Sequence, residues 1–373
     1  MVNPYDPQNP AKPDFFGGRK QVLQTVQERI EKAKIQRQSG GILVFGYRGV
    51  GKSSLLKKIT SNVSAQPQML VFYRRLSKTT SDSELYQLLV ESLLDEIGQR
   101  KNPVEKMLGS ISAAKLPVIE LELRFDSEWE SKTPYFKWRS LVKNIKNADA
   151  IVVEIDDADY LSPEALGELK TIVESDNNTP VVLIASGGID FEERLVDDYS
   201  PIARIFSGAS FNLGAFAPEE TMEVLEKPLA KDDTRWAAGA IAKVHELSGG
   251  YPFLVQCIAS ASYVEHAEIS VQRVVETLGA ALKIGSSWLN HELETASDND
   301  ITYFVKIANS GKTMFKSSEL SKLGISPPYI GRLVRLGVLK QISRGRYNLA
   351  KPPMIAHYHY LRRNMGEQEK KTI

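Results

Sequence analysis

The strongest constraint on the fold is a glycine-rich run between an apolar segment and a helix-compatible one. Residues 46–54 read Gly-Tyr-Arg-Gly-Val-Gly-Lys-Ser-Ser and match the pattern G-x-x-x-x-G-K-[ST] at every fixed position. The preceding run, 42–45, is apolar in the manner of a buried strand, and residues 53–60 suit a helix. Glycines let the backbone approach an anion, and loop N–H groups at a helix N-terminus form a nest for phosphate oxygens. The run therefore predicts a strand, a phosphate-binding loop and a helix.

The fixed positions of this loop predict a nucleotide triphosphate with Mg²⁺. Lys52 is expected to reach the β- and γ-phosphates, and the Ser53 hydroxyl is expected to bind the metal ion. The chain contains no N-K-x-D run of the kind that reads guanine, so we expect ATP rather than GTP. The predicted nucleotide-binding residues of the loop are Gly46, Tyr47, Arg48, Gly49, Val50, Gly51, Lys52, Ser53 and Ser54.

A second run, Ile-Val-Val-Glu-Ile-Asp-Asp at 151–157, supports the first. An apolar run that ends in two carboxylates is typical of a buried parallel strand with acids at its C-terminal edge, where open α/β sheets bind ligands. We expect Asp156 to hold Mg²⁺ through water, and Asp157 to orient or deprotonate the attacking water. Asp157 is one methylene shorter than the Glu often found there, so slow hydrolysis is expected. The alternative is a strand that simply ends in a polar turn.

The remaining pattern predicts an α/β fold, a P-loop NTPase with a parallel sheet sandwiched by helices, followed by a helical lid and a C-terminal winged helix. We expect a P-loop ATPase domain at 1–216, with a proline-rich N-terminal arm and an insertion around 101–134. The alternation of apolar and charged residues over 118–125 predicts an amphipathic strand in that insertion. Helical segments without strand signals predict a lid domain at 217–284, and the winged-helix domain is expected at 285–373.

Composition says more about the cellular compartment of the protein than about the reaction that it carries out. Apolar content of 42% and charged content of 25% are ordinary for a globular protein. Cys257 is the only cysteine, which excludes an intramolecular disulfide and a Cys-rich zinc site and suits a reducing cytosol. No apolar stretch reaches the ~18 residues of a membrane span. We therefore expect a cytoplasmic ATPase that does not associate with membranes.

The C-terminal segment concentrates positive charge. The layout of helices followed by two strands around Ser343-Arg344-Gly345-Arg346 predicts a winged helix. Residues 310–363 hold eleven Lys and Arg against one acid, Glu319, a net charge of +10, so the rest of the chain carries −9 of the total of +1. This charge favours double-stranded DNA as a partner. The alternative is a module that docks on the negatively charged remainder of the chain as an intramolecular clamp. The candidate DNA-binding residues are Arg332, Arg335, Arg344 and Arg346.

With these motifs assembled, the chain resembles the archaeal ATPase family of P-loop NTPases, which is AAA+/STAND-like and related to the origin-recognition initiator ATPases. The run 16–19, Phe-Gly-Gly-Arg, looks like the family's F-x-G-R box beside the nucleotide base, which implies roles for Phe16 and Arg19. The run 156–161 looks like D-E-A-Q-Y-L with Asp157 in place of Glu. Ser186 falls at the γ-phosphate sensor, and 250–252, Gly-Tyr-Pro, resembles the G-x-P element through which Pro252 would contact nucleotide.

The resemblance implies two kinds of switch. One binds DNA through the winged helix, as an initiator, a transposition helper or a genome-maintenance factor. The other is a STAND-type signalling or defence ATPase, in which the winged helix is a clamp and the partner is a protein. No Arg occurs between 237 and 272, so the lid arginine common in AAA+ proteins is missing. Arg204 falls where an arginine finger would reach a neighbouring copy in a homo-oligomer; an ordinary surface ion pair is the alternative.

Overall fold

The computed structural model describes residues 3–100, 120–121, 131–175, 177–230, 233–293 and 295–364. It divides the chain into two compact units. The sheet unit contains Arg19–Gly46 and Lys52–Leu213. The helical unit contains Met1–Gly18, Tyr47–Gly51 and Gly214–Ile373, so the tip of the glycine-rich loop packs with the C-terminal half of the chain. This two-way division does not test the expected three domains, which stay a prediction.

The sheet unit is built on a parallel sheet with strand order β2-β5-β6-β1-β7. Its three central strands are buried at every residue, because helices cover both faces of the sheet. The predicted α/β fold with a parallel sheet between helices is thereby confirmed. The strands are β1 (Gly40–Phe45), β2 (Met69–Arg75), β5 (Ala150–Asp156), β6 (Val181–Gly187) and β7 (Ser210–Asn212).

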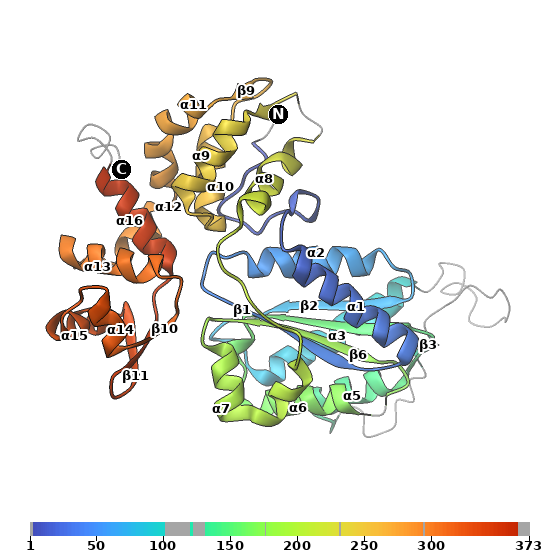
Figure 1. Ribbon diagram of the computed structural model, residues 1–373. Coiled ribbons are helices and arrows are strands. Elements are labelled where there is room, and N and C mark those ends of the chain that lie inside the picture. The colour runs from blue at the N-terminus through green and yellow to red at the C-terminus, as the bar shows by residue number, and fades with distance from the viewer. Residues whose placement is uncertain are drawn as a thin grey trace. The chain divides into compact units, whose positions relative to one another are not determined.

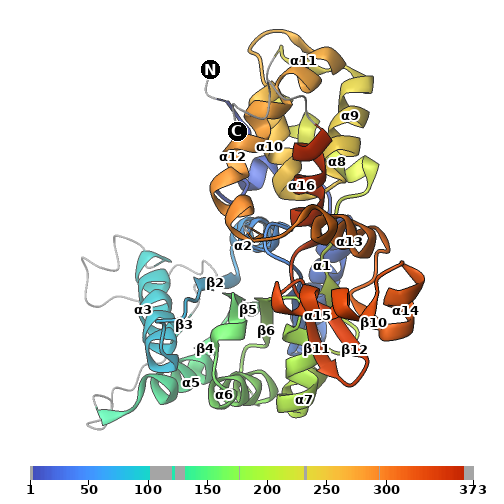
Figure 2. The same cartoon turned by 90° about the vertical axis from the view of Figure 1, so that its left-hand side faces the viewer.

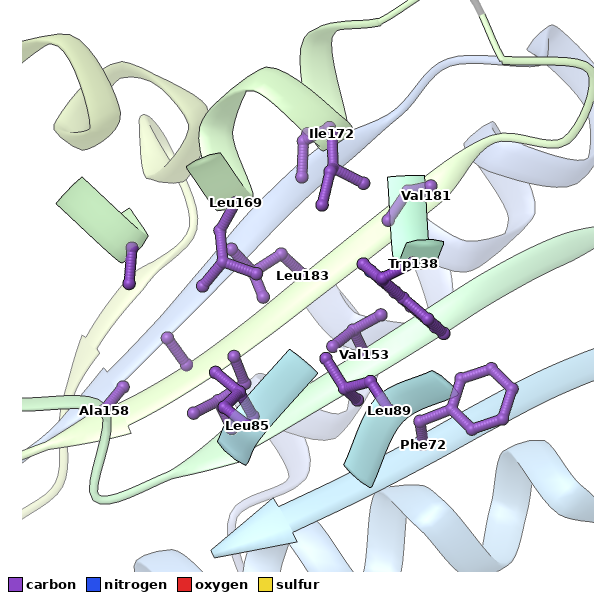
Figure 3. Packing of buried hydrophobic residues seen from close by; sticks show 14 of the residues in the cluster. Phe72, Leu85, Leu89, Trp138, Val153, Ala158, Leu169, Ile172, Val181 and Leu183 are labelled. Atoms are coloured by element: carbon purple, nitrogen blue, oxygen red, sulfur yellow. The ribbon is translucent and has the colours of Figure 1, made fainter. Parts of the chain in front are cut away.

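Helices cover both faces of this sheet, as Figure 1 shows. Helices α1 (Lys20–Gln36) and α2 (Lys52–Ser64) lie on one face. The opposite face carries α3 (Asp82–Arg100), α5 (Pro134–Asn144), α6 (Pro163–Glu174) and α7 (Phe191–Ala203). Alternate side chains of the strands pack into these helices, and Figure 3 shows Val153 and Leu183 of the sheet among Leu85, Trp138 and Leu169. This core fixes the strand ends that position the candidate site.

Short segments complete the sheet unit. The 3₁₀ turns Ala158–Tyr160 and Arg204–Phe206 follow β5 and α7. Strand β3 (Glu120–Leu121) pairs in antiparallel fashion with β4 (Ile145–Lys146). The rest of the amphipathic strand expected over 118–125 lies outside the described residues, so the insertion stays a prediction.

The helical unit opens with the N-terminal arm, which includes the 3₁₀ turn Pro13–Phe15. The arm is held by Tyr5, whose hydroxyl donates to the Leu225 carbonyl and accepts from Trp236 Nε1 at 2.7 Å. The expected lid segment is helical, but it also contains two short strands that pair in parallel, which the sequence reading did not predict. The elements are α8 (Pro218–Glu226), a 3₁₀ turn (Lys227–Leu229), β8 (Arg235–Trp236), α9 (Ala238–Ser248), α10 (Pro252–Ser262), β9 (Glu268–Ile269), α11 (Val271–Glu276) and α12 (Leu278–His291).

The last part of the helical unit, residues 298–364, is called here the C-terminal module. It contains three helices next to a three-stranded sheet with strand order β10-β12-β11, and a fourth helix follows at its C-terminal end (Figure 2). Its core is continuous with Leu254 of α10 and Leu282 of α12. None of the helices in the described part of the chain is long and apolar enough to cross a bilayer. The elements are α13 (Asp298–Asn309), β10 (Met314–Lys316), α14 (Ser317–Lys322), α15 (Pro327–Arg335), β11 (Leu339–Ser343), β12 (Arg346–Leu349) and α16 (Pro353–Asn364).

Candidate functional site

Within the sheet unit, the predicted polar residues meet at one edge of the sheet. Strand β1 ends directly before Gly46, and β5 ends at Asp156. Ser186 is the penultimate residue of β6, which lies between these two strands. The three strands run parallel, so their C-terminal ends share the edge at which open α/β sheets bind ligands. The sheet topology therefore joins residues that are more than a hundred positions apart in the sequence.

Asp156 is fully buried, and two hydroxyl groups hold its carboxylate. Ser186 Oγ donates to Oδ1, and the Tyr73 hydroxyl donates to Oδ2 at 2.9 Å. Burial, followed by the neighbouring charge of Asp156, raises the pKa of Tyr73, so this hydroxyl stays a hydrogen-bond donor across the physiological range. A buried carboxylate with a donor on each oxygen keeps a single orientation.

Asp157 follows directly but has a different environment. Its backbone is left-handed, with φ of 59°, a conformation that Asp tolerates better than most residues. Its N–H donates to Ser186 Oγ at 3.3 Å, and Oδ2 accepts from Arg75 Nε at 3.0 Å. Ser186 therefore bridges the two aspartates. The ion pair with Arg75 holds one oxygen of the Asp157 carboxylate in place.

Lys52 begins α2 and lies beside this acidic edge. Its Nζ donates to the Gly46 carbonyl at 2.8 Å. Burial lowers the pKa of Lys52, and the charges of Asp157, Asp156 and Asp159 act against that shift. A largely buried ammonium group among carboxylates is a site of concentrated charge, suited to a polyanion that brings its own cation.

The donor set at this edge fits Mg²⁺ that is held jointly with phosphates and water. The Ser53 hydroxyl, in the first turn of α2, and the Asp156 carboxylate supply the hard oxygen ligands that Mg²⁺ prefers. The described residues contain no group of three or more His, Cys, Asp or Glu that could hold a metal ion by itself. Ser54 follows Ser53 on the same helix.

The tip of the glycine-rich loop belongs to the helical unit and is packed there. Gly49 and Gly51 have φ of 85° and 92°, a backbone conformation that favours glycine, and Gly51 is one of the fixed positions of the motif. The Tyr47 hydroxyl donates to the Leu349 carbonyl at 2.6 Å. The Arg48 guanidinium lies 4.7 Å from the ring centroid of Trp288. Val50, the remaining predicted loop residue, is buried.

Two further predicted residues also lie in the helical unit. Phe16 is buried, and its carbonyl accepts from Lys227 Nζ at 2.7 Å, which ties the N-terminal arm to the turn after α8. Pro252 begins α10. The next residue, Phe253, would lie 3.3 Å from a β-carbon at Gly49, so the start of α10 is close to the loop tip.

The sheet unit also contains the two predicted arginines, Arg19 and Arg204. Arg19 precedes α1 with φ of 58°. Arg204 is 79% exposed and lies 3.9 Å from Glu174 in an open pocket that includes Gly40, the first residue of β1. The six residues of β1 separate Gly40 from Gly46, at the other end of the strand, by about 20 Å. Within the sheet unit Arg204 is therefore remote from the acidic edge, and its action on a neighbouring copy stays a prediction.

Sequence reasoning missed Tyr73, Arg75 and Asp159. The first two end β2, and the structure pairs β2 with β5 so that Arg75 lies opposite Asp156. The sequence did contain a signal for Tyr73 and Arg75, because they form the polar end of an apolar strand, the same pattern that identifies the aspartates after β5. For Asp159, burial raises the pKa of its carboxyl group.

Comparison with known proteins agrees with this geometry. Residues 35–195 match the family model described as an AAA domain. No curated protein matches the sequence. The matched segment contains the loop, both aspartates and Ser186, so the predicted resemblance to P-loop ATPases is confirmed.

Solved structures share the fold of the whole chain at low sequence identity. The ORC2 protein of Aeropyrum pernix, in ADPNP and ADP complexes, is 14% identical, with a TM-score of 0.53 over 92% of this chain and 93% of that chain. The ORC1 protein of Aeropyrum pernix in complex with DNA is 12% identical, with a TM-score of 0.51 over 96% and 95%. A Walker-type ATPase of Pyrococcus abyssi is 16% identical, with a TM-score of 0.51 over 92% and 96%. The chain therefore shares its fold with these solved structures.

Proposed function

We propose that this protein is a slow ATPase that acts as a molecular switch and binds double-stranded DNA through a C-terminal winged helix. The observation that carries the ATPase part is the cluster of Lys52, Asp156, Asp157 and Ser186 at one sheet edge of the segment that matches the AAA domain model. The likeness to the ORC1 protein, solved with DNA, supports the DNA part at the level of fold.

In the proposed mechanism the loop N–H groups bind phosphate oxygens, and Lys52 neutralises the β- and γ-phosphates. Ser53 and Asp156 would hold Mg²⁺, which would supply charge neutralisation at the transferred phosphoryl group. Ser186 and Tyr73 keep the Asp156 carboxylate in place. Asp157 orients or deprotonates the attacking water. The proposed sensor role of Ser186 rests on its two hydrogen bonds, which link both aspartates.

Two substitutions test the ATPase proposal. Lys52→Ala should abolish nucleotide binding or turnover, because it removes the ammonium group that faces the phosphates. Asp157→Asn should keep nucleotide binding and lose turnover. Competition experiments should show ATP preferred over GTP. Full ATPase activity in Asp157→Asn, or displacement of ATP by an equal concentration of GTP, would contradict the proposed roles.

The state of the basic residues in the C-terminal module supports DNA as the partner. Four of them form ion pairs within the described residues: Arg332 with Asp300, Lys312 with Glu319, Lys351 with Glu292 and Arg363 with Asp298. Arg335, Arg344 and Arg346 are exposed, and among the described residues none has a carboxylate within 4.0 Å. These three stay available for phosphates, whereas the ion pair gives Arg332 a structural role as well.

The exposed charges also share a surface. Lys316 of β10 lies opposite Arg346 of β12. Lys340 of β11 lies opposite Asn348, which is also on β12, two residues after Arg346. Residues two apart on a strand face the same side, so Lys316, Arg346 and Lys340 lie on one face of the small sheet. Arg344 lies in the turn between β11 and β12. We propose that this face and turn form the wing that contacts the DNA backbone.

Salt titration of DNA binding tests this part. The double variant Arg344→Glu and Arg346→Glu should weaken binding to all duplex sequences and reduce the slope of log K against log salt by about 2. A matched control is Arg139→Glu with Lys143→Glu, which reverses two exposed charges on α5 of the sheet unit. Equal losses in both double variants, or no loss in the first, would reject the wing as a DNA contact.

A STAND-type ATPase with a protein partner is the second candidate. The specific observation that favours it is the packing of Tyr47–Gly51 with the C-terminal module in one unit, as expected for a clamp. Measuring the ATPase rate with and without duplex DNA separates the two candidates, because stimulation by DNA favours the first. A lower ATPase rate for Arg204→Ala at concentrations where the protein self-associates would support the proposed homo-oligomer.

A further inference from the structure

The loop that is proposed to bind phosphate contacts the C-terminal module and the neighbouring helix α12. Tyr47 contacts the module, Arg48 contacts Trp288 of α12, and Gly49 lies against Met354 of the module. The side chains of Tyr47 and Arg48 are not among the groups proposed to act on phosphate, which are those of Lys52 and Ser53. Tyr47 packs against the core of the module, and its hydroxyl donates to the Leu349 carbonyl at the end of β12. Burial raises the pKa of Tyr47, so the hydroxyl remains a donor.

The neighbouring contacts leave little freedom at this junction. The Arg48 guanidinium stacks at 4.7 Å from the Trp288 ring centroid, on α12. A β-carbon at Gly49 would lie 3.1 Å from Met354 Cε, on α16. Leu349 and Met354 are both buried, so the loop tip contacts the module where β12 leads into α16.

We propose that Tyr47 couples the nucleotide state of the loop to the seating of the C-terminal module. This inference rests on the proposed function, because it assumes that the loop binds nucleotide. Phosphate binding fixes the backbone of residues 46–51. A Tyr47 that is already fixed loses less conformational entropy when its hydroxyl bonds to Leu349. Bound nucleotide therefore strengthens the seating of the module, and by linkage the seated module strengthens nucleotide binding by the same factor.

The coupling predicts that Tyr47→Phe weakens ATP binding by about three- to tenfold, the range of one net hydrogen bond to a partly buried acceptor. Hydrogen exchange at the amides of Ala350 and Ile355, which flank the contact, supplies the readout in the module. In the full-length wild-type chain, saturating Mg-ATPγS should slow exchange at both amides. In Tyr47→Phe at saturating nucleotide, that slowing should be absent or much smaller.

Two further variants sharpen the test. Arg48→Gln removes the contact with Trp288 and should lower the nucleotide-dependent protection in the same direction. Tyr303→Phe removes a hydroxyl from α13 of the same module without touching the loop contact, and it should behave like wild type. The proposal would be overturned if Tyr47→Phe kept the full nucleotide-dependent protection, or if Tyr303→Phe lost as much of that protection as Tyr47→Phe.

The outcomes also separate this inference from the proposed function. Nucleotide that binds the wild type without changing exchange at Ala350 or Ile355 would overturn the coupling alone. A wild-type chain that binds no nucleotide would overturn the proposed function, and the coupling with it.

Discussion

The two hydroxyl groups on Asp156 give a prediction that can be worked out from the structure. Ser186→Ala removes the donor to Oδ1 and leaves the Asp157 N–H without its Ser186 acceptor. Hydrogen bonds to charged groups contribute about 1.5–3 kcal/mol, so we expect a loss near 2 kcal/mol in the free energy of opening the sheet unit. Tyr73→Phe removes the donor to Oδ2, and its half-buried hydroxyl predicts a smaller loss of about 1 kcal/mol.

The double variant is the informative measurement. Either hydroxyl alone still satisfies one oxygen of a carboxylate that is fully buried, but removing both leaves it with neither donor. The loss in the double variant should therefore exceed the sum of the single losses by about 1 kcal/mol. Native-state hydrogen exchange at the amides of β5 and β6 measures the opening free energy of this unit directly.

The control for this cycle is Ser140→Ala with Tyr135→Phe, which removes the same two kinds of hydroxyl from α5. Neither residue hydrogen-bonds to Asp156, so this pair should be additive. Additive losses in Ser186→Ala and Tyr73→Phe, within about 0.5 kcal/mol, would refute the reasoning that the two hydroxyls jointly hold the carboxylate.

Two more predictions concern stability. Hydrogen bonds from the Arg332 guanidinium and from Ser297 lower the pKa of Asp300 from its ordinary 3.8 to about 2. The contribution of ionised Asp300 to the free energy of unfolding is therefore fully present above about pH 4 and is lost as the pH falls towards 2. The advantage of wild type over Asp300→Asn in urea unfolding, about 1–2 kcal/mol at pH 7, should shrink over that interval, and a constant difference would contradict this account. Gly187→Ala should destabilise the chain by about 1–3 kcal/mol, because its β-carbon would lie 2.3 Å from Phe191 Cδ1. Gly167→Ala, with open space around it on α6, should stabilise by about 0.5–1 kcal/mol, and equal effects would contradict the steric argument.

Several features of the sheet unit could be predicted from the sequence because local chemistry determines them. The runs before Gly46 and before Asp156 are almost entirely apolar, with Glu154 the one charged residue inside them, which is typical of central strands buried on both faces, and they are β1 and β5. The pair Ser162-Pro163 is also a local signal, because Ser favours the N-cap of a helix and Pro favours its first position. In the structure Ser162 Oγ accepts from the Ala165 N–H at 3.1 Å, and α6 begins at Pro163.

Residues that act through long-range pairing could not be assigned in this way. Tyr73 and Arg75 reach the aspartates only because β2 pairs with β5, a choice made by packing across the whole sheet. Arg332 is another example, because the sequence marks it only as a candidate DNA-binding residue. Its ion pair with buried Asp300, 32 positions earlier, depends on the packing of α13 against α15.

The glycine-rich loop contains both kinds of position, those that local chemistry determines and those that depend on long-range contacts. Its fixed positions are dictated by phosphate chemistry, so Gly46, Gly51 and Lys52 could be interpreted without any structure. Its variable positions are free of that constraint, and here Tyr47 and Arg48 are occupied by contacts with Leu349 and Trp288, some 300 and 240 residues later in the chain. A motif that accepts any residue at these positions cannot report such contacts. The variable positions are therefore the place where a P-loop protein can make contacts with a distant part of its own chain without changing the groups that bind phosphate.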